Sequence, residues 1–123
     1  MFPRIESDLI DLFEAIAFGR LDRHELVVSP RTAVTVVCVS GGYPGEYAKG
    51  MEISGLGKPS DSIVFHAGTS AKGAKVLTAG GRVLAVTSFG DGIEQAAAAS
   101  YRTIETIDYQ GKSCRTDIGR DLL

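Results

Sequence analysis

The sequence predicts an α+β, β-rich fold: a small antiparallel sheet of barrel or sandwich type, with an N-terminal helix and a second helix near the C-terminus. Apolar residues recur at helical spacing before residue 20 and again after residue 90. Between them lie short extended segments separated by glycine-rich turns, which is typical of compact antiparallel sheets. A length of 123 residues suits one domain, so we expect residues 1–123 to form a single domain.

The N-terminal helix is predicted from one apolar stripe with acidic residues on the opposite face. Gly19 is a suitable end for it, whereas Pro3 and Ser7 are both compatible with its beginning. The stripe comprises Ile5, Leu9, Leu12, Phe13 and Ile16.

The first strand is predicted over Ala33–Ser40, which is almost entirely β-branched or small and apolar, as expected for a strand buried on both faces. It ends at the turn formers Gly41–Gly45. Further extended segments are predicted at 51–54, 62–69, 75–79 and 82–88, with turns at 55–57, 70–73 and 80–81 and a closing strand within 112–117.

The second helix is predicted to start near Asp91, because Asp91 and Glu94 resemble a capping box, and to stop at Gly111. Its buried stripe has one polar member, Ser100. The stripe comprises Ile93, Ala96, Ala97, Ser100, Tyr101, Ile104 and Ile107.

Charge and composition exclude several classes of function. Thirteen basic and fifteen acidic residues give a net charge of −2, which argues against nucleic acid as a partner. No apolar run is long enough to span a membrane, and no secretory pattern opens the chain, so we expect the cytoplasm. Cys38 lies in an apolar run and is expected in the core, and the two Cys and two His lack zinc-finger spacing.

Four places carry candidate site residues. The glycine-rich loop with Gly42, Tyr43 and Pro44 is either a phosphate cradle or a tight connection after a strand, and it lacks the GK[ST] of a P-loop. His66 is either a hydrogen-bonded structural residue or a catalyst, but no nucleophile can be paired with it from the sequence. We predict no catalytic residue and no metal ligand within this chain.

Arg82 directly follows Gly80 and Gly81, whose missing side chains allow close approach of another group. Its guanidinium suits a phosphate or carboxylate of a substrate, an acidic group of a neighbouring domain, or a surface salt bridge. Asp117 is spaced to share a face with Arg115, which favours an internal ion pair, but it is also a possible partner for Arg82.

Four stretches in order resemble one family. They are Pro3–Leu9; Ser40–Gly45 with Tyr47, Lys49-Gly50, Ile53 and Gly55-Leu56; Phe65–Thr69 with Thr78 and Gly80–Leu84; and Arg115–Gly119. Together they resemble the C-terminal part of phosphoribosylamine–glycine ligase (glycinamide ribonucleotide synthetase), of the ATP-grasp superfamily. Ser70, Ala79 and Thr116 depart from that pattern, where relatives usually have Lys, Asn and Lys.

The resemblance implies a C-terminal domain of barrel-sandwich-hybrid type in a monomeric enzyme that joins glycine to 5-phosphoribosylamine in purine biosynthesis. ATP and Mg²⁺ (or Mn²⁺) would bind to the preceding ATP-grasp domains of the same polypeptide, and no cofactor to this chain. The isolated chain is then expected to be inactive, with apolar side chains exposed near Leu9, Phe13 or Ile16, or near the Tyr43 loop. The alternative is a biotin- or lipoate-carrier-like binding module, although Lys72 and Lys75 lack the sequence around a carrier lysine.

Overall fold

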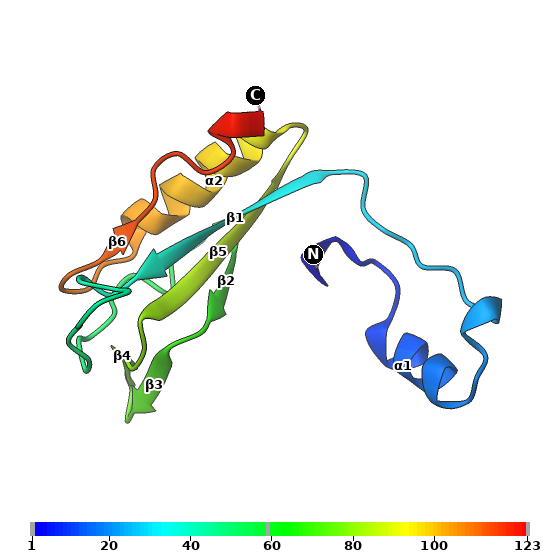
Figure 1. The fold of residues 1–123 in the computed structure, drawn as a ribbon, viewed down its shortest axis with the longest axis horizontal. Helices are drawn as coiled ribbons and strands as arrows, with labels where there is room; N and C mark the ends of the chain where they lie inside the picture. The colour runs from blue at the N-terminus through cyan, green and yellow to red at the C-terminus, as the bar shows by residue number, and fades with distance from the viewer. Residues whose placement is uncertain (1, 59, 123) are drawn as a thin grey trace.

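The computed structural model describes residues 2–58 and 60–122. Its main element is a four-stranded antiparallel sheet in the order β2-β5-β1-β6, next to a two-stranded β3-β4 hairpin (Figure 1). The elements are α1 (Leu9–Ala17), β1 (Thr32–Val39), β2 (Ile63–His66), β3 (Thr69–Lys72), β4 (Lys75–Thr78), β5 (Arg82–Gly90), α2 (Ile93–Thr106) and β6 (Ser113–Cys114), with 3₁₀ turns at Phe2–Arg4, Leu21–Arg23 and Arg120–Leu122. The α+β, β-rich class with its two helices is confirmed, and the sheet stays open rather than closing into a barrel.

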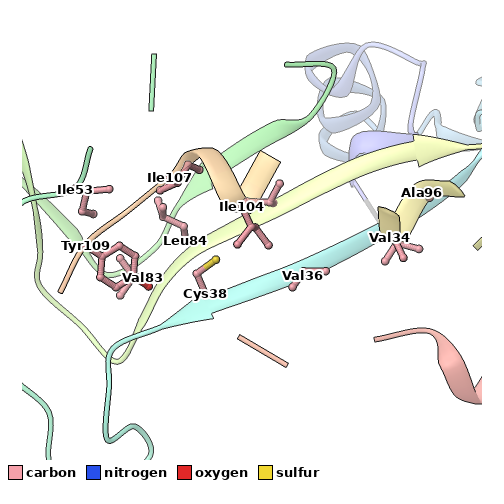
Figure 2. Close-up of a cluster of buried hydrophobic side chains, with 12 residues drawn as sticks. Val34, Val36, Cys38, Ile53, Val83, Leu84, Ala96, Ile104, Ile107 and Tyr109 are labelled. Carbon is pink, nitrogen blue, oxygen red and sulfur yellow. The ribbon is translucent and has the colours of Figure 1, made fainter. Parts of the chain in front are cut away.

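Helix α2 lies along one face of β1 and β5 and buries the core there (Figures 1 and 2). Its predicted stripe is largely buried, and the hydroxyl of the polar member Ser100 donates a hydrogen bond to the Val34 carbonyl (3.0 Å) and forms a second one with the Ser88 hydroxyl (2.9 Å). The core comprises Val34, Val36, Cys38, Ile53, Val83, Leu84, Val86, Ala96, Ala97, Ile104, Ile107 and Tyr109. A hydroxyl with two partners inside this core avoids the cost of an unsatisfied polar group.

Both ends of α2 differ from the prediction, and the helix ends at Thr106 instead of Gly111. The capping box is wrong: the N-cap is Gly92, and the side chain of Gln95 accepts a hydrogen bond from the Asp91 N–H (2.6 Å). After the last turn, Lys112 Nζ donates to the carbonyls of Ile104 (3.0 Å) and Ile107. A lysine ammonium suits the partial negative charge of a helix C-terminus.

Strand β1 alternates between buried and exposed residues, so burial on both faces is a wrong prediction. Val34, Val36 and Cys38 face α2, whereas Thr35 and Val37 point to the opposite face. The run of β-branched residues is equally compatible with either arrangement, because β-propensity does not report which face is covered. We call the face opposite α2 the open face.

Three shorter predictions need correction. The predicted turn over 70–73 contains strand β3, and the hairpin turn is confined to Gly73 and Ala74. Segment 51–54 makes isolated bridges, Glu52 to Leu77 and Ser54 to Asp108, instead of a continuous strand. The closing strand within 112–117 shortens to Ser113–Cys114.

The N-terminal segment projects away from the sheet (Figure 1). Asp8 caps α1 by accepting hydrogen bonds from the N–H groups of Ile10 and Asp11, and Gly19 follows its end with a φ of 64°. Phe13 and Ile16 are 59% and 57% exposed, which confirms the expected apolar surface. Neither helix of the described residues has the length and hydrophobicity needed to cross a membrane.

Candidate functional site

A β-bulge turns Arg82 onto the open face. Cys38 pairs with Leu84, but the next residue of β1, Val39, pairs with Arg82, so β5 contains one extra residue at this point. Val83 and Leu84 are consequently both buried, while Arg82 is exposed. Strict alternation would have placed Arg82 on the same side as Leu84, under α2. The bulge is therefore what brings this cation to the solvent-accessible side.

Arg82 lies between two hollows of the open face. One, of about 540 Å³, has an apolar floor from β1 and is bordered by Tyr43, Pro44, Arg82 and Arg115. The other, of about 460 Å³, is bordered by Val37, Tyr43, Gly81, Arg82 and Ala85 among others. Tyr43 and Arg82 line both hollows. An arginine and a tyrosine over an apolar floor can bind an anion that also carries apolar or hydrogen-bonding groups.

The loop that carries Tyr43 is held by its glycines. Gly42 has a φ of 95°, and a Cβ there would collide with the Glu46 carbonyl. A Cβ on Gly81 would overlap the Tyr43 ring, so the ring packs directly on the Gly81 backbone. The Tyr43–Pro44 peptide bond is cis. The open space at Gly81 is thus filled from within the chain, by Tyr43.

The loop and the start of β5 are also joined by hydrogen bonds. Ser40 donates from its N–H to the Gly81 carbonyl (2.8 Å) and from its hydroxyl to the Gly80 carbonyl (2.9 Å). Gly80 packs against Gly68, and a Cβ added to either glycine would come too close to the backbone of the other. These contacts fix the backbone from which Arg82 extends.

Asp117 pairs with Arg115 rather than with Arg82. Arg115 donates to both carboxylate oxygens, from Nε at 2.8 Å and from the terminal nitrogen at 2.7 Å, which confirms the internal ion pair. The hydrogen bond from Arg115 lowers the pKa of Asp117, and the same bond raises the pKa of Arg115. Arg82 makes no side-chain hydrogen bond or ion pair with any residue that the structure describes.

His66 does not join this site. It pairs with Leu84 across β2 and β5, on the α2 side of the sheet, and its Nδ1 lies 3.0 Å from Thr69 Oγ1. The side chain is exposed. This geometry favours the hydrogen-bonded structural interpretation.

Sequence comparison identifies the chain. The family described as "Phosphoribosylglycinamide synthetase, C domain" matches residues 33–121. The chain belongs to this family. It is 44% identical over 118 residues to phosphoribosylamine–glycine ligase of Vibrio cholerae, and 42% identical over 127 residues to a bifunctional purine biosynthetic protein of Dictyostelium discoideum.

A solved structure shares the same fold. The chain superposes on phosphoribosylamine–glycine ligase of Thermotoga maritima with a TM-score of 0.68 and 34% identity, over 85% of this chain and 27% of that one. The alignments cover 94% and 100% of this chain but only 28% of the Vibrio and 16% of the Dictyostelium protein. The chain thus spans about a quarter or less of the relatives that it matches.

Two members of the site were not singled out as such from the sequence. Arg115 and Ile118 border the larger hollow because the segment after β6 runs past the end of β1. The sequence indicated Arg115 only as a partner for Asp117, because the order of residues does not indicate which strand edge a C-terminal segment will contact. The synthetase C-domain motif Arg115–Gly119 thereby comes next to the motif at Arg82.

Across residues 2–58 and 60–122, no three His, Cys, Asp or Glu side chains come close enough to share a metal ion. The loop at Gly42 also lacks the lysine of a P-loop.

Proposed function

We propose that this chain is the C-terminal domain of an ATP-dependent phosphoribosylamine–glycine ligase of purine biosynthesis, and that its open face forms one wall of the site for the phosphorylated amine substrate. Family membership supports the ligase, and the unpaired Arg82 between two hollows supports the wall. ATP and Mg²⁺ would bind to other domains of the same polypeptide, which would be a cytoplasmic monomer. The isolated chain would then be inactive.

Arg82 is the residue that would bind the acidic group of the substrate or of a neighbouring domain. Its fork of N–H donors fits a phosphate or a carboxylate, and no acidic side chain in the described chain already occupies it. Arg115 borders the same hollow, but Asp117 neutralises much of its charge. Arg82 is therefore the cation that would bind the substrate phosphate or an acidic group of the neighbouring domain.

The other candidate residues have supporting roles in the proposal. Gly42 and Pro44 shape the loop, Gly81 seats the Tyr43 ring, and Gly80 allows the contact with Gly68. Asp117 would hold Arg115, and His66 would hold the turn before Thr69 through its hydrogen bond.

Apolar side chains would cover the rest of the interdomain contact. Ile63, Phe65 and Val37 lie on the open face, since their partners in register are Thr87 and Ala85. Each is at least 37% exposed. Apolar groups clustered on one side of a sheet indicate a surface that another domain buries.

A carrier function is the second candidate, because Lys72 and Lys75 are register partners at the tip of the β3-β4 hairpin. Lys75, however, forms an ion pair with Glu52 at 2.6 Å. The intact mass of protein made in a host with biotin and lipoate ligases separates the two functions. An added biotinyl or lipoyl group would contradict the accessory-domain proposal.

The main test replaces the corresponding segment of the Vibrio cholerae ligase with residues 1–123 and measures ligation. We expect Arg82→Ala to lower kcat/KM for phosphoribosylamine by about tenfold or more, equivalent to ~1.4 kcal/mol. Arg102→Ala is the matched control, because Arg102 lies exposed on α2 at the other side of the sheet. The 123-residue chain alone should show no ATP-dependent ligation.

Two outcomes would contradict the assignment. One is ligation by the isolated chain. The other is an Arg82→Ala variant that unfolds the isolated chain while the chimeric enzyme keeps its kinetics, which would make Arg82 structural.

A further inference from the structure

The two cysteines of the chain face each other across a strand pair. Cys38 on β1 and Cys114 on β6 are direct partners in the antiparallel register, and both thiols are free. Partners in register point to the same side of a sheet. Cys38 belongs to the core under α2, and Cys114 packs against that core.

The pair occupies a position where the strands approach closely. The N–H of Ser40 points to β5, where it bonds the Gly81 carbonyl. Because backbone groups alternate sides along a strand, those of Cys38 also point to β5, and those of Val39 point to β6. Cys38 and Cys114 therefore form a non-hydrogen-bonded pair, for which the Cα separation is typically about 4.5 Å. That separation lies within the range of disulfide-bonded cysteines.

The two thiols differ in access to solvent. Cys38 is fully buried, with its sulfur among the core side chains in Figure 2. Burial, with a smaller contribution from Cys114, raises the pKa of the Cys38 thiol to about 11. Cys114 is partly exposed and lies on the edge strand β6. An external reagent would thus reach Cys114 first.

We propose that Cys38 and Cys114 form a reversible cross-strand disulfide by exchange with a low-molecular-weight disulfide such as glutathione disulfide. The Cys114 thiolate attacks one sulfur of the reagent, forms a mixed disulfide and expels one thiolate. Cys38 then loses its proton, attacks the sulfur of Cys114 and expels the second thiolate. Two protein thiols are oxidised, and one external disulfide is reduced to two thiols.

The bond would act on the edge of the sheet that borders the larger hollow. Strand β6 pairs with β1 over only two residues and leads directly to Arg115, whose carbonyl also accepts a hydrogen bond from the Tyr101 hydroxyl (2.9 Å). A disulfide would fix it there and restrict how far Arg115 can move relative to Arg82. The inference rests on strand register and on the burial of the two thiols, and so it is independent of the proposed function.

The test incubates the 123-residue chain with glutathione disulfide, blocks the remaining thiols with iodoacetamide and measures the intact mass. We expect the monomer to lose the mass of two hydrogen atoms and to accept no alkyl group, and dithiothreitol should restore both thiols. The oxidised chain should melt ~5 °C or more above the reduced chain, because the bond closes a long loop in the unfolded state.

Single-cysteine variants identify the order of events. Cys38→Ala should stop at a stable glutathione adduct on Cys114, whereas Cys114→Ser should react at least tenfold more slowly than the wild type. Melting curves of the reduced variants show that each is folded. A persistent adduct in the wild type, two thiols that stay alkylatable, or a disulfide-linked dimer would each overturn the proposal.

Discussion

The two faces of the β1-β5 sheet carry different side chains although they alternate along the same strands. The face under α2 consists of buried Val34, Val36, Leu84 and Val86, and no buried side-chain polar atom of the described residues lacks a hydrogen-bond partner. The open face carries exposed apolar side chains and the unpaired Arg82. Packing and recognition are therefore separated within one pair of strands, and variants on the two faces should affect different properties.

The largest expected effect is a loss of stability caused by a substitution on the face under α2. Leu84→Ala removes a side chain with 0% exposure and should lower the free energy of unfolding by about 3 kcal/mol, through lost burial and the cavity left behind. Val37→Ala on the open face, where the side chain is 37% exposed, should cost less than about 1 kcal/mol. Urea unfolding of the isolated chain measures both.

Equal losses from the two variants would contradict this comparison. They would indicate that Val37 is packed in solution, for instance against a second copy of the chain. A dependence of the Val37→Ala loss on protein concentration would then identify that packing.

The second effect is a loss of stability at alkaline pH, and it again arises from a residue on the face under α2. Burial raises the pKa of Cys38 to about 11, above the value near 8.5 of a thiol in an unfolded chain. The unfolded state then releases a proton that the folded state retains, so stability is intact below about pH 8.5 and falls as pH rises towards 11. The full difference corresponds to roughly 3 kcal/mol. Burial also raises the pKa of Tyr109, which acts in the same direction.

Urea unfolding of the reduced chain at several pH values between 8 and 11 measures this loss. Cys38→Ala should have a flatter profile than the wild type over that range. A wild-type profile with no decline would show that the Cys38 thiol is not confined to the core in solution.

Long, strongly patterned elements were predictable from the sequence. The helical stripe around Ser100 and the β-branched run of β1 gave the right elements because each pattern has one dominant period. The order of the strands and the openness of the sheet could not be predicted, since they depend on contacts between distant segments. Helix α1 was found, but its exposure followed only from the family resemblance.

The site was predictable only in part. Arg82 and the Tyr43 loop were identified, but the reason for the glycines was not, because Gly81 accommodates a ring from 38 residues earlier in the chain. The sequence indicates the bulge that exposes Arg82 only weakly, through two adjacent apolar residues, Val83 and Leu84. Asp117 pairs with Arg115 and not with Arg82 because of the path of the chain after β6, which the sequence does not indicate.

The smallest expected effect concerns the Arg115–Asp117 pair beside the open face. Both side chains are well exposed, so solvent and salt screen the pair. The hydrogen bond from Arg115 lowers the pKa of Asp117, so the pair stabilises the fold at pH values above the ordinary carboxyl pKa of about 4. This stabilisation is lost as pH falls through the lowered pKa. Asp117→Asn should therefore shift Tm by no more than ~2 °C at pH 7, and the difference from wild type should shrink as pH falls through the lowered pKa of Asp117. In the chimeric enzyme the same variant leaves Arg115 unpaired next to Arg82, and the added positive charge should lower KM for the phosphorylated amine at low salt. A larger loss of Tm would instead show that Asp117 holds the segment after β6 in place, and the open face would then depend on this pair for its shape as well as its charge.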